Sequence, residues 1–145
     1  MEKLKTYYLT IDGRLPGLNE YTDASRANKY KSAQMKKDAQ TLVMWHIRSQ
    51  LRGMKIEHPV HLSFTWFERD RRRDHDNISS FGRKVIQDAL VSCGVLHDDG
   101  WGYVASHSDS YAVDAKKPRI ELVIVELPGT VKPKDRSGSQ KGRRF

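Results

Sequence analysis

The residues with the clearest capacity for chemistry lie between positions 69 and 99, RDRRRDHDNISSFGRKVIQDALVSCGVLHDD. Asp74 and Asp76 follow a run of arginines, and Asp98 and Asp99 follow an amphipathic segment that ends in glycine. Carboxylates converging from two loops suit a hard divalent cation such as Mg²⁺, which binds through a few carboxylates and keeps several waters. Arginines beside such a site suit a phosphodiester substrate. The combination predicts a metal-dependent enzyme acting on nucleic acid.

Backbone conformation decides whether Asp74 and Asp76 can act together. In an extended segment they share a face and His75 points away, whereas a helix turns them apart. A predicted strand precedes them and a predicted helix follows, so we expect an extended segment, with Asp76 or Asn77 as the helix N-cap. That helix, roughly 25 Å long, separates Asp76 from Asp99. Either the following loop doubles back along the helix or a second subunit completes the site.

This stretch resembles the RusA family of Holliday junction resolvases. The resemblance lies in R-R-R-D-x-D-N at 71–77, D-A-L-x-x-x-G at 88–94 and the acidic pair at 98–99, and it extends loosely over residues 6–126. It implies a small homodimeric nuclease that cuts four-way DNA junctions with Mg²⁺, or with Mn²⁺ in its place. It also implies paired symmetric cuts that leave 5′-phosphates, in DNA recombination and repair.

The resemblance assigns the metal ligands residue by residue. Asp74, Asp76 and Asp99 are the implied catalytic and metal-binding residues, for one or two ions. The sequence does not separate Asp98 from Asp99 as the ligand, although Asp99 matches the family spacing better. A plainer interpretation is that the acidic residues pair with neighbouring arginines on a solvated surface.

The family lysine has two candidate positions in this chain. Lys84 matches when the pattern is counted back from Asp88, but counting forward from Asp76 reaches Ser80, because four extra residues lie between them. Arg83 is a rival for the same role. A cation there would offset charge that develops in the transition state. Lys84 could equally be a solvated residue on the polar face of its helix.

The charge balance favours an anionic polymer as partner. The chain has 145 residues, a net charge of +8 and 26 Lys and Arg, a balance that predicts nucleic-acid binding by a local basic patch. The residues expected to contact DNA are Arg69, Arg71, Arg72, Arg73, Arg83, Arg26, Lys29 and Lys31. The aromatic side chains Tyr21 and Tyr30 accompany the last three in a predicted loop over 12–31, a composition suited to gripping a backbone and stacking on bases.

We expect one endonuclease domain over residues 1–127 and a disordered basic tail over 128–145. The tail is rich in Gly, Ser, Pro and charge, and it carries +5 of the net charge. A solvated terminus and a DNA-contacting tether are both compatible with this composition. The single cysteine, Cys93, excludes a disulfide framework and is expected to be a buried small hydrophobe. With no signal-like or membrane-spanning run, a cytoplasmic protein with no membrane partner is expected.

Hydrophobic periodicity predicts the order β-α-β-α-β-β. Strands are expected at 6–11, 59–67, 103–113 and 118–127, and helices from a Ser32 N-cap to about Arg52 and from about Asn77 to just before Gly94. His46, on the apolar face of the first of these helices, is expected at the core or its boundary rather than as a ligand. A hairpin-like turn is expected at 114–118. The fold class is therefore α/β (α+β), a small mixed sheet with helices on one face.

The sequence leaves the assembly surface and the exact activity open. Apolar residues at 66–67 and 120–125 are the two expected sources of a homodimer interface. The leading hypothesis is a junction-resolving endodeoxyribonuclease. The alternatives are a metal nuclease acting on forks or flaps, and a non-catalytic basic DNA- or RNA-binding module.

Overall fold

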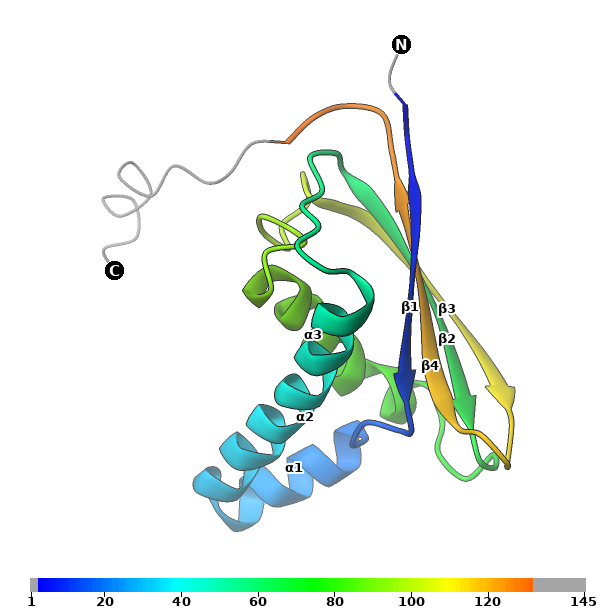
Figure 1. The fold of residues 1–145 in the computed structure, drawn as a ribbon. Helices are drawn as coiled ribbons and strands as arrows, with labels where there is room; N and C mark the ends of the chain where they lie inside the picture. Colours follow the sequence, from blue (N-terminus) through cyan, green and yellow to red (C-terminus); the bar gives the residue numbers. More distant parts are fainter. Residues whose placement is uncertain (1–2, 132–145) are drawn as a thin grey trace.

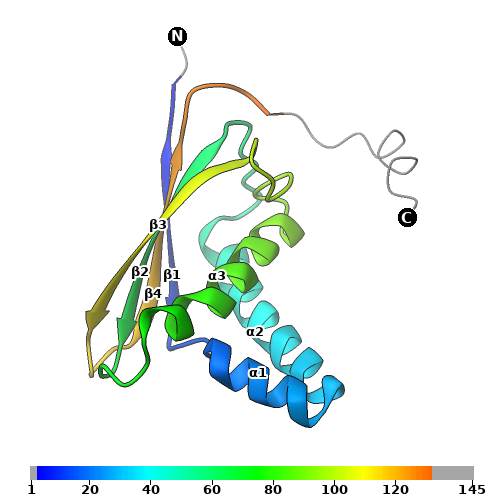
Figure 2. The same cartoon turned by 180° about the vertical axis from the view of Figure 1, so that it is seen from behind.

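A computed structural model describes residues 3–131 of the chain as a four-stranded mixed sheet with three helices (Figure 1). The strands and helices follow one another along the chain in this order: β1 Thr6–Asp12, α1 Leu18–Ala27, α2 Lys29–Gln50, β2 Val60–Glu68, α3 His75–Ser92, β3 Val104–Val113 and β4 Arg119–Glu126. Helices α2 and α3 lie on one side of the sheet, and α1 packs on those two helices beyond the ends of the strands. The fold class expected from the sequence is confirmed. The view from behind shows that all three helices lie on the same side of the sheet (Figure 2).

The sheet order is β1-β4-β2-β3, in which only β2 and β3 are parallel. The crossover from β2 through α3 to β3 lays α3 along the sheet, and this connection places the acidic motif at one end of the strands. The predicted hairpin-like turn at 114–118 is wrong, because β3 and β4 lie on opposite sides of β2 and do not pair. The turn instead crosses the end of β2, where the amide of Asp114 donates to the carbonyl of Glu68.

Alternating side chains bury one face of the central strands. In β2 the residues Val60, Leu62, Phe64 and Trp66 are all buried, as the sequence predicts. The almost continuously apolar strand β4 lies inside the sheet between β1 and β2, although only alternate residues reach the core. A period of two thus sets which face of the sheet meets the helices.

The helix α3 presents a continuous apolar stripe to the sheet. Its predicted core positions from Ile78 to Leu90 are buried, and Cys93 is half-buried at its end. Burial raises the pKa of the Cys93 thiol, in keeping with a structural rather than a reactive cysteine. Gly94 has φ +80° directly after the helix, and its amide donates to the carbonyl of Val91, so it ends α3 as expected.

The predicted loop over residues 12–31 is wrong, because it contains α1 and the start of α2. In α1 only Ala24 is buried, so the segment has no apolar stripe to reveal it in the sequence. The carboxylate of Glu20 accepts the amide of Gly17, the kind of contact that marks a helix start. Asn28, not Ser32, caps α2 by accepting the amide of Tyr30.

The end of the described chain contacts the body. The amide of Val131 donates to the carbonyl of Glu57, so residues 128–131, at the start of the predicted tail, are held against the segment before β2. Residues 132–145, the remainder of that predicted tail, lie outside the described residues. Among residues 3–131, no helix combines the length and apolar character needed to cross a membrane.

Candidate functional site

The loop from β2 to α3 is anchored by a buried ion pair between Glu68 and Arg73. The guanidinium of Arg73 donates to both carboxylate oxygens of Glu68, at 3.0 and 2.8 Å, and to the carbonyl of Leu15 at 3.2 Å. Only 13% of the Arg73 side chain and 7% of the Glu68 side chain are exposed. Arg14 adds a second cation at 3.3 Å from Glu68. Arg73 was expected to contact DNA. Its contacts instead hold the loop to the end of β2 and to the segment that follows β1.

Asp74 and Asn77 position two helices at this end of the sheet. Asp74 is the N-cap of α3 and accepts the amide of Asn77 at 2.8 Å. The side-chain oxygen of Asn77 accepts the amide of Asn19 at 2.8 Å, which ties α1 to α3. A Cβ on Gly17 would lie 2.6 Å from that same oxygen, so the docking of the helices requires a glycine there.

The predicted extended Asp-x-Asp arrangement is wrong, because the helix begins two residues earlier than expected. Asp76 lies in the first turn of α3, where the helix dipole favours its ionised form, and Asp74, not Asp76 or Asn77, is the N-cap. His75 was expected to point away from both carboxylates. All three residues instead line one pocket.

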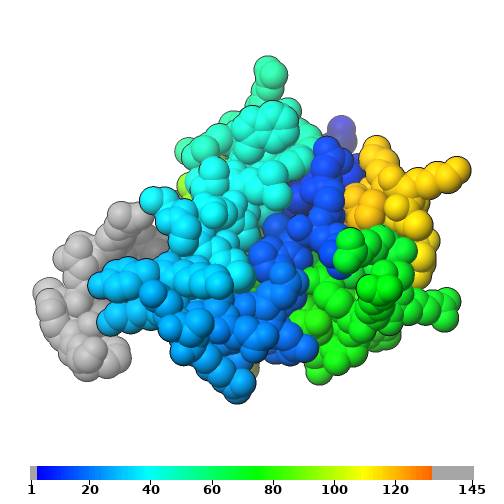
Figure 3. All heavy atoms as spheres, turned by 90° about the horizontal axis from the view of Figure 1, so that it is seen from below, coloured from blue at the N-terminus to red at the C-terminus, as the bar shows by residue number. Residues whose placement is uncertain are grey.

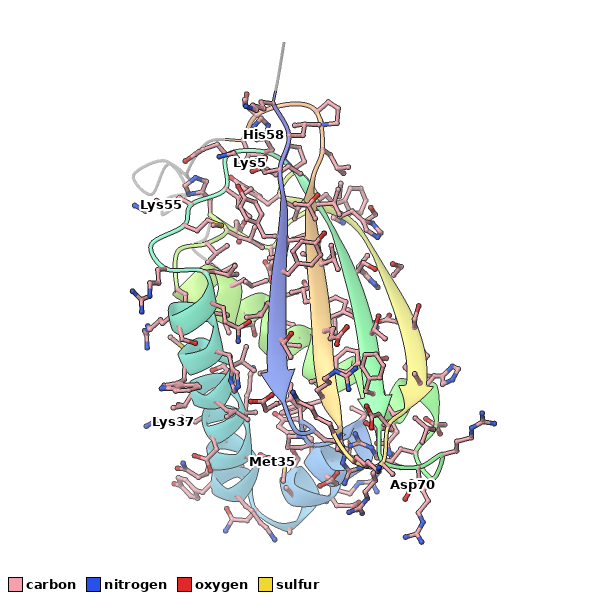
Figure 4. All side chains as sticks on the ribbon, turned by 45° about the vertical axis from the view of Figure 1, so that its right-hand side comes forward. Lys5, Met35, Lys37, Lys55, His58 and Asp70 are labelled. Atoms are coloured by element: carbon pink, nitrogen blue, oxygen red, sulfur yellow. The ribbon has the colours of Figure 1, made fainter. Side chains whose placement is uncertain are left out.

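This pocket has a volume of about 730 Å³ and opens where β2 and β3 end. It is lined by acidic, basic, aromatic and aliphatic side chains: Glu68, Asp70, Arg71, Arg73, Asp74, His75, Asp76, Ile78, Tyr111, Ala112 and Val113. Figure 4 shows Asp70 at the tip of this end, beyond the strands. The pocket combines two exposed carboxylates, Asp74 and Asp76, with the exposed cation of Arg71. The carboxylates suit a divalent metal ion, and the guanidinium suits a phosphate group.

The third predicted acid, Asp99, lies elsewhere along α3. The loop after the helix does double back, and Asp99 reaches the ammonium of Lys84 at 3.0 Å. Lys84 lies eight residues beyond Asp76 on the same helix, roughly 12 Å along its axis. Within residues 3–131, no three acidic, histidine or cysteine side chains gather closely enough to hold a metal. The three predicted metal ligands are therefore not brought together within one chain.

Lys84 bridges two carboxylates, and Arg83 points to a different partner. The Lys84 ammonium lies 3.0 Å from Asp88 as well as from Asp99, and these contacts, led by Asp99, raise the pKa of Lys84. Arg83 instead lies 3.5 Å from Asp109 on β3. Of the two candidates for the family lysine, Lys84 is the one in contact with a predicted metal ligand.

Several exposed cations lie at the end of the molecule that holds the pocket. Arg69, Arg71 and Arg72 project from the loop before α3. Figure 3, which looks at this end, shows that loop (green), the corner between α1 and α2 (blue to cyan) and the turn between β3 and β4 (yellow) on the same surface. The corner carries the predicted DNA contacts Arg26, Lys29 and Lys31, all exposed. Tyr21, by contrast, stacks on Phe81 at 4.6 Å and is half-buried.

Sequence reasoning missed two lysines and an exposed tryptophan. Lys116 and Lys117 are exposed on the turn between β3 and β4, where Asp114 accepts both of their amides. Their place beside the arginine loop follows from the sheet order, which the sequence does not reveal. Trp101 is 96% exposed two residues after Asp99. The sequence around Trp101 has no hydrophobic periodicity, so it does not predict whether this side chain is buried or exposed.

Comparisons with known proteins do not assign the chain to a family. No protein-family model matches it, and no curated protein matches it. A solved structure of PurLQS from Thermotoga maritima is similar over 90% of this chain, at 15% identity and a TM-score of 0.34. The chain spans 19% of that structure's length. A similarity this weak carries no argument about fold or function.

Proposed function

We propose that this chain is a metal-dependent endodeoxyribonuclease that acts on branched DNA and resolves four-way junctions. The observation that carries the proposal is the pocket at the end of β2 and β3. There Asp74 and Asp76 line the same pocket as Arg71, on the end of the molecule that also carries the exposed cations of the loop before α3 and of the turn between β3 and β4. The resemblance of residues 71–99 to RusA resolvases supports the junction as the substrate.

The donor set of the pocket fits Mg²⁺. This ion commonly binds proteins through one or two carboxylates and keeps waters and substrate phosphates as its other ligands. Asp74 and Asp76 supply two such carboxylates, and Asp74 uses one oxygen for the helix cap. When bound, Mg²⁺ would lower the pKa of a coordinated water and neutralise charge on the phosphate. Mn²⁺ suits the same oxygen ligands.

The chain's own residues would orient the DNA around that pocket. Arg71 is exposed on the pocket rim and makes no ion pair within residues 3–131, so its guanidinium is available for a phosphate. Arg73 keeps the loop in place through Glu68 rather than by contacting DNA. The lysines and arginines of the neighbouring corner and turn would bind the flanking backbone.

Asp99 would join the site through a second subunit. A four-way junction is nearly two-fold symmetric, and a homodimer supplies two sites related by one two-fold axis. We propose that Asp99 of one protomer approaches the pocket of its partner. If so, a mixture of Asp76→Asn and Asp99→Asn chains regains activity in heterodimers that contain one intact composite site. Failure of the mixture to exceed either variant alone would place Asp99 outside the site.

Cleavage of a synthetic four-way junction tests the function itself. With Mg²⁺ we expect symmetric nicks that leave 5′-phosphate and 3′-hydroxyl ends, and less cleavage of forks and linear duplex. Asp74→Asn, Asp76→Asn and Asp99→Asn should each abolish cleavage and retain junction binding. Asparagine also caps helices well, so Asp74→Asn separates the metal role from the cap. Asp23→Asn, on the exposed side of α1, is the matched control and should cut normally.

A non-catalytic DNA- or RNA-binding module is the second candidate. It is favoured by the structural partners that two of the predicted metal ligands already have, namely the helix cap at Asp74 and the Lys84 contact at Asp99. Such a module would shift a junction in a gel but never cut it at any Mg²⁺ or Mn²⁺ concentration. A nuclease for forks or flaps would cut those substrates faster than the junction.

A further inference from the structure

Two aromatic rings form a flat stack at the wall of the pocket. His75, the first residue of α3, lies on Tyr111 of β3 with ring centroids 3.7 Å apart and planes 4° from parallel. Both residues line the pocket. Tyr111 covers one face of the imidazole, and His75 is nevertheless exposed and lines the pocket, so its ring is accessible to a ligand there.

Hydrogen bonds hold this stack in one orientation. The hydroxyl of Ser79, one turn along α3 and 2% exposed, donates to the carbonyl of His75 at 2.9 Å. The hydroxyls of Ser79 and Tyr111 are 2.8 Å apart, so the Tyr111 proton completes the pair. The tyrosine is therefore fixed to the helix that carries the histidine. A pre-oriented aromatic surface binds a planar ligand with little loss of side-chain entropy.

The remaining walls complete a site for one nucleotide. Ile78 and Val113 add aliphatic surface beside the rings, and Arg71 adds a cation within the same pocket. The volume of about 730 Å³ is in the range of small-molecule sites and exceeds what one nucleotide needs. Stacking on aromatic rings tolerates any base, because every base has a π-face.

We infer that this pocket accepts one unpaired nucleotide of the DNA substrate, with its base stacked on His75 and its phosphate directed to Arg71. The inference rests on the proposed function, for which it supplies a source of selectivity. Where the arms of a branched DNA are not coaxially stacked, a base at the branch point has lost a stacking neighbour and is cheaper to extrude than a base inside a duplex. A pocket that requires an extruded base therefore favours branched DNA over linear DNA.

Fluorescence of a 2-aminopurine placed at the branch point of a four-way junction tests the inference. The full chain is bound to this junction with Ca²⁺ in place of Mg²⁺, so that binding is followed without cleavage. We expect a change in fluorescence on binding by the natural chain, and no such change with a 2-aminopurine far from the branch. His75→Ala should remove the signal and weaken junction binding about tenfold, within the usual worth of one stacked base.

Three matched variants make the result specific. His75→Phe keeps a flat ring without the imidazole nitrogens and should retain both signal and affinity. Tyr111→Phe, which loses only the hydroxyl bonded to Ser79, should retain most of the affinity. Trp45→Ala, which removes an exposed aromatic side chain on α2, should leave the signal unchanged. Retention of signal in His75→Ala, loss in His75→Phe, or loss in Trp45→Ala would each overturn the inference.

Cleavage measured in parallel with Mg²⁺ separates this inference from the proposed function. A chain that cuts junctions, but whose His75→Ala variant cuts and binds normally, retains the nuclease function and refutes the nucleotide pocket. A chain that never cuts, but shows the His75-dependent signal, retains the nucleotide pocket and refutes the nuclease. Equal thermal melting of His75→Ala and the natural chain is the control for folding.

Discussion

The ammonium of Lys84 lies 3.0 Å from the carboxylate of Asp99, fifteen residues further along the chain. The same ammonium lies 3.0 Å from Asp88, one turn away on α3. The contact fixes the loop after α3 against the side of that helix. Because this contact keeps Asp99 beside Lys84, Asp99 lies apart from Asp74 and Asp76. The three predicted metal ligands of one chain therefore form two groups rather than one.

Substitution of Lys84 should affect activity more than stability. The Lys84 side chain is 60% exposed, so its ion pairs contribute less than about 1 kcal/mol to folding. If Lys84 supplies the catalytic cation, Lys84→Met should slow junction cleavage about 100-fold, the usual effect of losing one charge-stabilising donor. Arg83→Met is the control, because Arg83 contacts Asp109 and not Asp99. An equal loss of cleavage rate in both variants would show that Lys84 has no catalytic role that Arg83 lacks.

Substitution of Arg73 should lower the free energy of unfolding of the protein. Arg73→Met leaves the Glu68 carboxylate buried with only Arg14 nearby, and loss of one partner of a buried ion pair typically costs about 3–5 kcal/mol. Denaturant unfolding should detect this loss. Arg72→Met, at a side chain that is 84% exposed, should change stability by less than about 0.5 kcal/mol. A stable Arg73→Met variant with weak DNA binding would instead restore Arg73 as a DNA contact.

Asp114 should make the protein sensitive to acid. The hydrogen bond from Arg119, followed by the amide of Lys117, lowers the pKa of Asp114. A carboxyl group whose pKa is lower in the folded state stabilises the folded protein at pH values above the ordinary aspartate pKa. This stabilisation is lost as the pH falls through the pKa of the folded state. Stability of Asp114→Asn should therefore depend less steeply on pH below about pH 4. Identical pH profiles for both proteins would contradict this linkage.

Removal of residues 132–145 should weaken DNA binding through electrostatics. This segment carries six Lys and Arg and one Asp. Each phosphate contact releases counterions, so the slope of log affinity against log salt should become shallower by a few units at most. Thermal melting of the shortened chain is the control, and we expect it to be unchanged. An unchanged salt slope would show that these cations do not contact DNA.

A homodimer should form at micromolar concentration. Light scattering should give about twice the chain mass of 16.7 kDa. Of the two apolar segments expected at the interface, Trp66 is buried in the core, which leaves Phe67, Val123 and Val125 on the sheet face opposite the helices. Val123→Lys should therefore give a monomer if this face is the interface. In that case Asp99, which lies against α3 on the other side of the sheet, would not reach the partner's pocket, and the mixed-variant experiment should show no regained activity. A natural chain that remains monomeric on the junction would count against the resolvase.

The sequence by itself determined the strands, the longest apolar helix face and the acidic and basic motif. Periods of 2 and 3.6 residues report which side chains are buried, and they do so from local spacing alone. The core faces of β2 and α3 are therefore as expected from their sequences. Arg69, Arg71 and Arg72 are exposed, as expected from their residue type, because arginine is seldom fully buried.

Only the tertiary structure decided which of these residues meet. Helix α1 has one buried residue and is held by contacts with distant groups, such as the Asn77 oxygen, so local periodicity does not reveal it. Arg73 resembles its neighbours in the sequence and is distinguished only by Glu68 and Leu15. The His75–Tyr111 stack joins residues 36 positions apart across the connection from α3 to β3. Such contacts depend on how the strands are ordered in the sheet, and that order is set by the packing of the whole chain rather than by any one segment.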